Sequence, residues 1–167
     1  MDALLKHKYP LQLWANNPIL RLPADPIEEI TPDIRQFAYD LVELMRMYEG
    51  VWLAAPQVWQ SLRIIATTQW KNSKRWQKNT GELVMINPEI VEKSEQLTLS
   101  DEACLSLPGE TGTVKRYKSV TVSYLDPEGK KHRQQFHDFN ATVVQHEIDH
   151  IDGVLFIDKL APKKTNK

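Results

Sequence analysis

The most regular pattern of apolar and polar positions lies between residues 31 and 50. Apolar side chains recur there at helical spacing, with polar residues between them. Thr31 suits the N-cap position and Pro32 the first helical position, and we expect Gly50 to end the helix in a left-handed conformation. The pattern predicts an amphipathic helix that packs on the core through Ile34, Phe37, Ala38, Leu41, Leu44, Met45 and Tyr48.

Short apolar runs with turn signals at their ends follow this helix. Residues 62–66 and 83–86 are typical of short strands. Residues 114–125 and 131–139 flank an Asp-Pro-Glu-Gly sequence at 126–129, which favours a tight turn. These last two segments therefore predict a β-hairpin.

A second helix is predicted near the C-terminus. Asn140 suits its N-cap, the helix is expected over residues 141–151, and Gly153 lies just past its end. Strands and helices do not alternate regularly, so the predicted fold class is α+β with mixed or antiparallel sheets. We expect one catalytic domain over residues 1–167, with residues 161–167 forming a frayed, lysine-rich tail.

The composition narrows the class of protein. Lys and Arg number 21 against 22 Asp and Glu, so the chain lacks the basic excess expected of a DNA-binding protein. No run approaches the roughly 20 apolar residues that cross a bilayer, and residues 1–10 show no signal-peptide pattern. A single cysteine excludes an intramolecular disulfide and is typical of intracellular proteins. We therefore expect a soluble cytoplasmic protein that binds neither DNA nor membranes.

The strongest chemical signal is His146-Glu147-Ile148-Asp149-His150 on the second predicted helix. Side chains four residues apart lie on one helical face, so His146 and His150 can bind one metal ion. Glu147 can then accept a proton from a water molecule at that ion. A charged surface helix that matches the pattern by chance is the competing interpretation.

A catalytic metal site of this kind needs a third protein ligand. Residues 151–167 contain no His, Cys or Glu, and their only acidic residues are Asp152 and Asp158. The third ligand is therefore expected upstream, where Cys104 is the obvious candidate. A small buried apolar role, which free cysteines usually have, is the alternative.

Three sequence blocks surround these candidates. They are Gly-Val-Trp-Leu-Ala-Ala-Pro-Gln at 50–57, Asp-Glu-Ala-Cys-Leu-Ser-Leu-Pro-Gly at 101–109 and Gln-His-Glu-Ile-Asp-His at 145–150. In this order and spacing they resemble the motifs of the peptide deformylase family, and shorter similarities extend the resemblance to about residues 16–160. The resemblance implies an α+β fold packed around a central C-terminal helix that carries the His-Glu-x-x-His motif.

The resemblance also implies a metal-dependent hydrolase that removes the formyl group from the N-terminal formyl-methionine of new proteins. Its partners would be the formyl-methionyl nascent peptide and the ribosome surface. By motif, Cys104, His146 and His150 would hold one divalent ion, Fe²⁺ in the native protein, with Zn²⁺ or Ni²⁺ able to replace it. Glu147 would act as general base and then as general acid.

Further site roles follow from the same resemblance. Gln57 and the backbone N–H of Leu105 would bind the oxyanion that develops in the transition state. Gly50, Val51 and Ala103 would bind the substrate, and Val51 would hydrogen-bond its backbone as if the peptide were an added strand.

An internal ion pair is implied as well. Glu49 precedes the first block, and Arg116 lies in Val-Lys-Arg at 114–116. Both match positions that pair with each other in the family. Two unconnected surface charges are the alternative.

Three positions depart from the family pattern. Trp52 and Trp59 stand where the family has glycine, and Ala103 replaces the glycine before Cys104. The chain has 5 Trp and only 6 Gly, so we hypothesise that these tryptophans are UGA codons that the organism reads as glycine. The alternative is a natural Trp52 that reshapes the cleft and is strained if its φ is positive. Besides deformylation, two functions stay open: a zinc metallopeptidase, and a deformylase fold whose cleft Trp52 obstructs.

Overall fold

The computed structural model describes residues 2–71 and 78–162, so residues 163–167 of the predicted tail lie outside the described residues. No helix in the described segments is long and apolar enough to cross a membrane. Short 3₁₀ helices lie at η1 (Pro18–Leu20), η2 (Ala55–Val58) and η4 (Phe156–Lys159). The main elements are α1 (Asp2–Lys8), α2 (Pro32–Met47), β1 (Trp52–Ala54), β2 (Ile64–Trp70), β3 (Asn79–Lys93), β4 (Leu97–Ala103), β5 (Thr111–Tyr117), β6 (Ser119–Leu125), β7 (Lys131–His137) and α3 (Asp138–Ile151).

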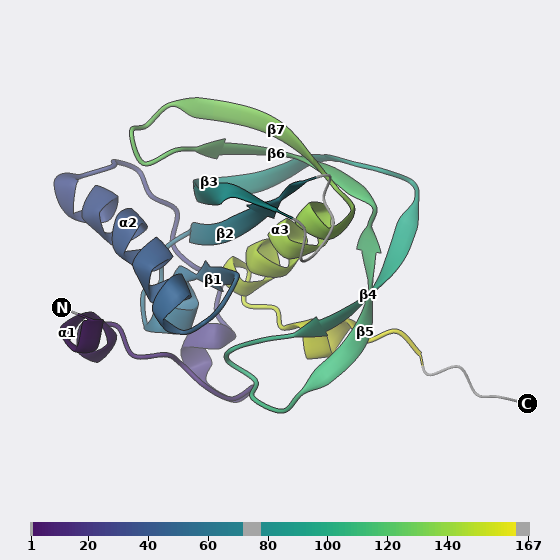
Figure 1. Cartoon of the computed structure of the whole chain (residues 1–167), viewed down its shortest axis with the longest axis horizontal. Coiled ribbons are helices and arrows are strands. Elements are labelled where there is room, and N and C mark those ends of the chain that lie inside the picture. The colour runs from purple at the N-terminus through teal and green to yellow at the C-terminus, as the bar shows by residue number, and fades with distance from the viewer. Residues whose placement is uncertain (1, 72–77, 163–167) are drawn as a thin grey trace, which may run out of the picture.

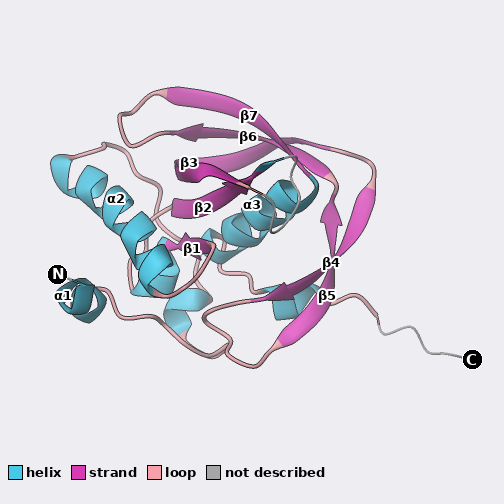
Figure 2. Ribbon diagram, viewed as in Figure 1, coloured by secondary structure: helices cyan, strands magenta, loops and turns pink. Residues whose placement is uncertain are grey.

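The strands form a large and a small antiparallel sheet within the described residues (Figures 1 and 2). The large sheet has the strand order β1-β2-β3-β6-β7, and the small sheet is the β4–β5 pair. Helix α3 lies in the centre, between the large sheet and the β4–β5 pair (Figure 1). The predicted α+β fold around a central C-terminal helix is confirmed.

Alternate residues of the central strands build two cores on opposite faces of the large sheet. Ile64 and Ala66 of β2 pack with α2, whereas Ile65 between them packs with α3. This is the period of two that places successive strand side chains on opposite faces. Because both faces of the sheet are covered, β2 is buried almost throughout, and α3 packs against one of these faces.

Helix α2 begins as predicted but ends differently. The Thr31 hydroxyl accepts a hydrogen bond from the Ile34 N–H at 3.3 Å, and Pro32 is the first helical residue. The helix ends at Met47, and the left-handed residue after it is Glu49 (φ 57°), not Gly50. A Cβ at Gly50 would lie 2.7 Å from Leu105 Cδ1, the far end of that side chain, and 3.3 Å from the Trp52 carbonyl oxygen. The predicted left-handed end at Gly50 is therefore wrong, and the glycine instead permits close approach of the Leu105 loop.

Helix α3 begins two residues before the predicted cap. It starts at Asp138, and Asn140 lies inside its first turn. The Asn140 amide instead bonds the backbone of Trp70 in both directions, accepting from its N–H at 3.2 Å and donating to its carbonyl at 3.1 Å. Gly153 follows the helix with φ 74°, as predicted. Residues 140–151 are all buried, so any polar side chain on this helix needs a partner or a ligand.

The predicted hairpin is present as β6 and β7. The carboxylate of Asp126 accepts hydrogen bonds from the N–H groups of Glu128 and Lys130, which closes the turn. The predicted strand over residues 114–125 is divided at Lys118, because its first half pairs with β4 and its second half with β3. Neither α1 nor β4 was predicted from the sequence.

Candidate metal centre and active site

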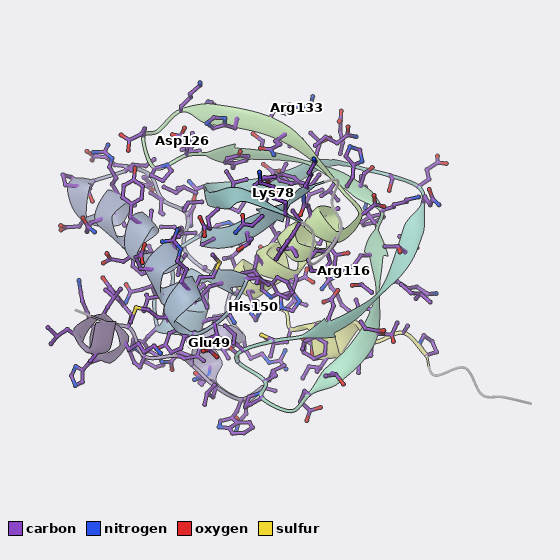
Figure 3. The ribbon with its side chains drawn as sticks, in the orientation of Figure 1. Glu49, Lys78, Arg116, Asp126, Arg133 and His150 are labelled. Carbon is purple, nitrogen blue, oxygen red and sulfur yellow. The ribbon has the colours of Figure 1, made fainter. Side chains whose placement is uncertain are left out.

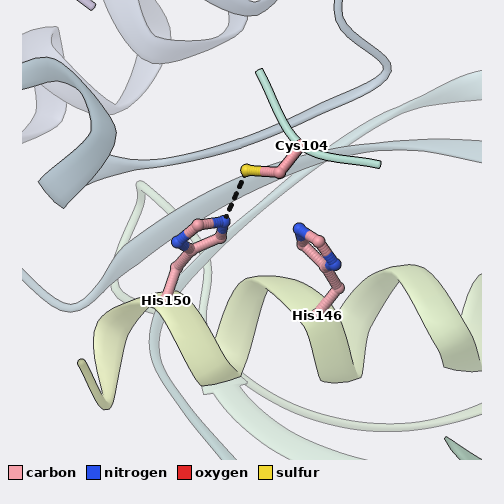
Figure 4. Close-up of side chains that lie close together, drawn as sticks. All are labelled: Cys104, His146 and His150. Atoms are coloured by element: carbon pink, nitrogen blue, oxygen red, sulfur yellow. Dashed lines mark hydrogen bonds between the residues drawn. The ribbon is translucent and has the colours of Figure 1, made fainter. Parts of the chain in front are cut away.

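Two elements bring Cys104, His146 and His150 together. The two histidines lie one turn apart on α3, and the cysteine directly follows β4 (Figure 4). One potential ligand atom from each residue lies within 4.8 Å of the others, and all three residues are buried. Cys104 Sγ lies 3.2 Å from His150 Nε2. The arrangement therefore has the donors and spacing of a metal site.

The surroundings of His146 fit a metal ion. Its Nδ1 lies 2.8 Å from Glu102 Oε2, so this nitrogen donates to the carboxylate and leaves a lone pair on Nε2. That Nε2 atom is buried and has no hydrogen-bond partner among the described residues. One sulfur and two imidazole nitrogens suit Zn²⁺, Fe²⁺ or Ni²⁺. The residues present therefore fit the metal that the motif predicts.

A buried charge network holds Glu102 in place. Arg116 donates to both Glu102 oxygens at 2.8 Å and to Asp149 Oδ2 at 2.5 Å. Lys159 Nζ lies 2.6 Å from the other Asp149 oxygen. Burial alone would raise the pKa of Glu102, but hydrogen bonds from Arg116 and His146 lower it to about 2. Glu102 is thus a carboxylate at neutral pH and can orient the His146 imidazole.

The predicted ion pair between Glu49 and Arg116 is wrong. The Arg116 guanidinium is occupied by Glu102 and Asp149, and Glu49 lies exposed at the end of α2. Figure 3 shows Glu49 and Arg116 well apart. A buried guanidinium is paired by carboxylates that can be buried with it, and Glu49 is not one of them.

Glu147 is buried beside the three candidate metal ligands. Neither of its carboxylate oxygens has a hydrogen-bond partner among the described residues, and Oε1 lies 3.9 Å from His146 Nε2. Burial and then the charge of Glu102 raise its pKa well above the ordinary value. An unpaired buried carboxyl with a raised pKa is typical of a residue that exchanges protons during a reaction.

The pKa values of the cysteine and the second histidine are also shifted. Burial and the charge of Glu147 raise the pKa of the Cys104 thiol to about 12. Burial, with the charges of His146 and Arg116, lowers the pKa of His150 well below its usual range. The histidine is therefore neutral and able to ligate, while the thiol needs a nearby positive charge before it ionises.

Gln57 reaches the cluster from η2. Its Oε1 accepts a hydrogen bond from the Ala54 N–H at 2.9 Å, which fixes the direction of the amide. Its Nε2 donates to Ser106 Oγ at 3.0 Å and lies 3.5 Å from Cys104 Sγ. The side chain is fully buried, so its N–H groups face Ser106 and the cysteine sulfur rather than bulk solvent.

A pocket of about 330 Å³ opens beside the cluster. The structure thus brings the predicted substrate-binding residues together with the candidate metal ligand Cys104 and with Leu105. The exposed Glu49 is among its lining residues rather than in an ion pair with Arg116. The lining residues are Glu49, Gly50, Val51, Trp52, Ala103, Cys104, Leu105 and Pro108.

Trp52 and Trp59 differ in backbone conformation. Trp52 is an extended strand residue without a positive φ, and its ring centroid lies 5.9 Å from those of both His146 and Phe139. Trp59 has φ 66° and ψ 25°, a left-handed conformation that favours glycine. Trp14 is also left-handed, with φ 74°. Backbone strain therefore falls on Trp59 and Trp14, and not on Trp52.

Sequence reasoning missed four residues of the site. Glu102, Asp149 and Lys159 form the charge network, and Ser106 accepts from Gln57. Asp149 lies inside the helical motif, and Glu102 stands two residues before the cysteine, so proximity in sequence to the ligands was the available signal.

Comparisons with known proteins agree with this geometry. The model of the polypeptide deformylase family matches residues 13–166. A peptide deformylase of Bradyrhizobium diazoefficiens is 40% identical over 148 residues, which are 89% of this chain and 85% of that protein. The crystal structure of peptide deformylase from Thermotoga maritima has a TM-score of 0.83 at 32% identity, covering 93% of this chain and 99% of that one.

A crystal structure from Acinetobacter baumannii, a class I type b peptide deformylase with Met-Ala-Ser bound, is similar too. It has a TM-score of 0.83 at 35% identity and covers 91% of this chain and 98% of that one. Each of these similarities covers about nine tenths of the chain, and the family model matches the blocks around the cysteine and the two histidines. The chain belongs to the polypeptide deformylase family.

Proposed function

We propose that this protein removes the formyl group from the N-terminal formyl-methionine of newly made proteins, with Cys104, His146 and His150 holding one divalent ion. Membership of the deformylase family supports the reaction. One observation carries the assignment of residues: the buried cluster of one sulfur and two imidazoles lies beside the unpartnered carboxyl of Glu147. Burying a carboxyl group without a hydrogen-bond partner costs folding free energy, so such a group in a native structure points to a functional role.

The ion supplies Lewis-acid chemistry when bound, lowering the pKa of a water molecule and polarising the formyl oxygen. Glu147 accepts the proton that the attacking water loses. It then gives that proton to the amine nitrogen as the C–N bond breaks, so the products are formate and a free N-terminal amine. The raised pKa of Glu147 suits a group that takes up and releases a proton near neutral pH.

Negative charge develops on the formyl oxygen in the transition state. Gln57 is held by the Ala54 N–H, so its Nε2 points towards the cluster without reorganisation. The backbone N–H of Leu105, next to the cysteine, is the second proposed donor. Loss of one such donor typically slows a reaction about 100- to 1,000-fold.

The pocket beside the cluster is the proposed binding site for the start of the peptide. Gly50, Val51 and Ala103 all line this pocket, and a peptide bound there would form hydrogen bonds with their backbone groups. The Met-Ala-Ser bound to the Acinetobacter enzyme supports a peptide as ligand. The whole chain would act as one catalytic domain, in the cytoplasm and at the ribosome surface, where formylated chains emerge.

Fe²⁺ is the proposed native metal, with Zn²⁺ or Ni²⁺ able to replace it. The mixed sulfur and nitrogen donor set accepts all three ions. A thiolate ligand also makes an iron site sensitive to oxidation, so activity lost in air and restored by fresh Fe²⁺ would support iron.

The proposal is tested with protein purified without air. We expect one equivalent of divalent metal and formate release from formyl-Met-Ala-Ser, with no cleavage of casein. Casein cleavage would favour the metallopeptidase, which the family membership does not support. Metal binding without formate release would instead indicate that Trp52, which lines the pocket against His146, obstructs the cleft.

A further inference from the structure

The strand β4 presents an open backbone edge that leads to the active site. It runs from Leu97 to Ala103 and is followed at once by Cys104. Within the described residues its only strand partner is β5, so its other edge has no neighbouring strand. An unpaired edge is a template for another extended chain.

Three contacts of neighbouring residues show which backbone groups face this edge. The Lys118 N–H donates to the Gln96 carbonyl, so residues 96 and 118 form a hydrogen-bonded pair at the end of the β4–β5 ladder. Hydrogen-bonded pairs alternate along an antiparallel ladder, so the even-numbered residues of β4 are the ones bonded to β5. The backbone of Tyr117, opposite Leu97, bonds instead to the Gln145 side chain. The carbonyl of Thr113, opposite Asp101, accepts from Ala161 N–H on the far side of β5.

The odd-numbered residues of β4 therefore turn their backbone N–H and C=O groups away from β5. These residues are Leu97, Leu99, Asp101 and Ala103, and no backbone partner is recorded for them among the described residues. Leu99 C=O accepts only a long bond, 3.5 Å, from the Thr98 hydroxyl. The open edge spans about 20 Å at the usual rise of a strand.

The side chains of the same residues form an exposed row. Leu97 is 51% and Leu99 58% exposed, while Glu102 of the alternate row points inward to His146. Exposed leucines on an unpaired edge favour self-association unless another chain covers them. The row is continuous with the pocket, because Ala103 belongs to both.

We propose that the β4 edge binds the downstream part of the nascent chain, from about the fourth to the eighth residue, as an added antiparallel strand. This rests on the proposed function, which puts the formyl end of the substrate at Cys104. From there the peptide can leave the pocket past Ala103 and run opposite to β4, passing Asp101, Leu99 and Leu97. Backbone bonds would give affinity for any sequence, and the two leucines would favour apolar or β-branched residues.

The proposal is tested with three formylated peptides on metal-loaded enzyme. They are formyl-Met-Ala-Ser, formyl-Met-Ala-Ser-Val-Thr-Val-Thr-Val and a flexible control, formyl-Met-Ala-Ser-Gly-Ser-Gly-Ser-Gly. The valine-rich octapeptide is expected to have a KM about tenfold below that of the tripeptide, with kcat unchanged, because added contacts bind substrate and transition state equally. Equal kcat/KM for the three peptides would overturn the proposal.

The double variant Leu97→Thr/Leu99→Thr keeps strand-forming residues but removes the apolar row. It is expected to lose the advantage of the octapeptide while its kcat/KM on the tripeptide stays unchanged. Leu22→Thr is the matched control, since Leu22 is 61% exposed outside β4. Survival of the octapeptide advantage in the double variant would overturn the proposal.

Two further measurements separate other outcomes. Sedimentation of the wild type should show a monomer; a dimer that the double variant abolishes would mean that the edge pairs with a second copy, and would overturn the proposal. Binding of the unformylated octapeptide is measured directly by fluorescence anisotropy. If the tripeptide were not deformylated but this peptide bound wild type and not the double variant, the proposed function would fail while the docking edge stood.

Discussion

Trp59 occupies a backbone conformation in which glycine should be more stable than any other residue. Its φ of 66° and ψ of 25° lie in the left-handed region, which costs a residue with a Cβ about 1–2 kcal/mol relative to glycine. The greater freedom of glycine in the unfolded chain offsets about 0.4–1 kcal/mol of this. Trp59→Gly is therefore expected to be more stable than Trp59→Ala by about 1 kcal/mol, or about 2–4 °C in Tm for a chain of this size.

The alanine variant is the necessary reference. It removes the indole, which is 56% exposed, but keeps the Cβ that causes the strain. Trp52 provides a matched control because its backbone is extended. At this position the order of stability should reverse, and Trp52→Ala should be more stable than Trp52→Gly by about 0.5–1 kcal/mol. Thermal unfolding of the four metal-loaded variants measures both differences. Trp59→Gly equal to or less stable than Trp59→Ala would refute the strain argument.

The other predictions concern the gene, the cleft and the metal site. UGA codons at positions 52 and 59 are expected if the organism reads UGA as glycine, and also at position 14, where the backbone is left-handed as at 59; UGG codons at 52 and 59 would end that hypothesis. Trp52→Gly should raise kcat/KM by opening the pocket, yet lower Tm, because it loses the ring contacts with His146 and Phe139 without relieving strain; an unchanged kcat/KM would show that the indole is accommodated. Glu102→Gln should weaken metal binding about 10- to 100-fold, measured by competition with a chelator. Because the pKa of Glu102 in the folded protein, about 2, is below its ordinary value of 4.5, its stabilising effect should be present above pH 4.5 and be lost as pH falls towards 2. The unfolding free energy of Glu102→Gln should therefore vary less over that range, and parallel curves would contradict this.

Local signals in the sequence predicted α2 and α3, though not α1, and they indicated the two histidines as candidate metal ligands. The Thr31–Pro32 start of α2 and the left-handed Gly153 after α3 depend on backbone groups only a few residues away. The local sequence is therefore enough to predict them. The His146 and His150 spacing needs only a helix to put both rings on one face. Cys104 needed a resemblance as well, because no local rule joins it to α3.

Contacts between distant segments were not predictable in the same way. Asn140 is a good N-cap residue, but its amide is taken by the Trp70 backbone, which only the folded sheet brings within reach. Several acidic residues could have been the ion-pair partner of Arg116, and the actual partners are the carboxylates that are buried beside it in the fold. The division of residues 114–125 between two sheets likewise follows from strand pairing, which hydrophobic periodicity does not specify.

The most direct test of the account is the variant Glu147→Gln, in which metal content and formate release are measured on the same preparation. The amide fills the same buried space but accepts no proton at neutral pH. We predict one equivalent of bound metal, as in wild type, and a kcat on formyl-Met-Ala-Ser lower by about 100- to 10,000-fold. Full metal content with a kcat reduced less than about tenfold would contradict the assignment of Glu147 as the proton carrier, and with it the proposed mechanism.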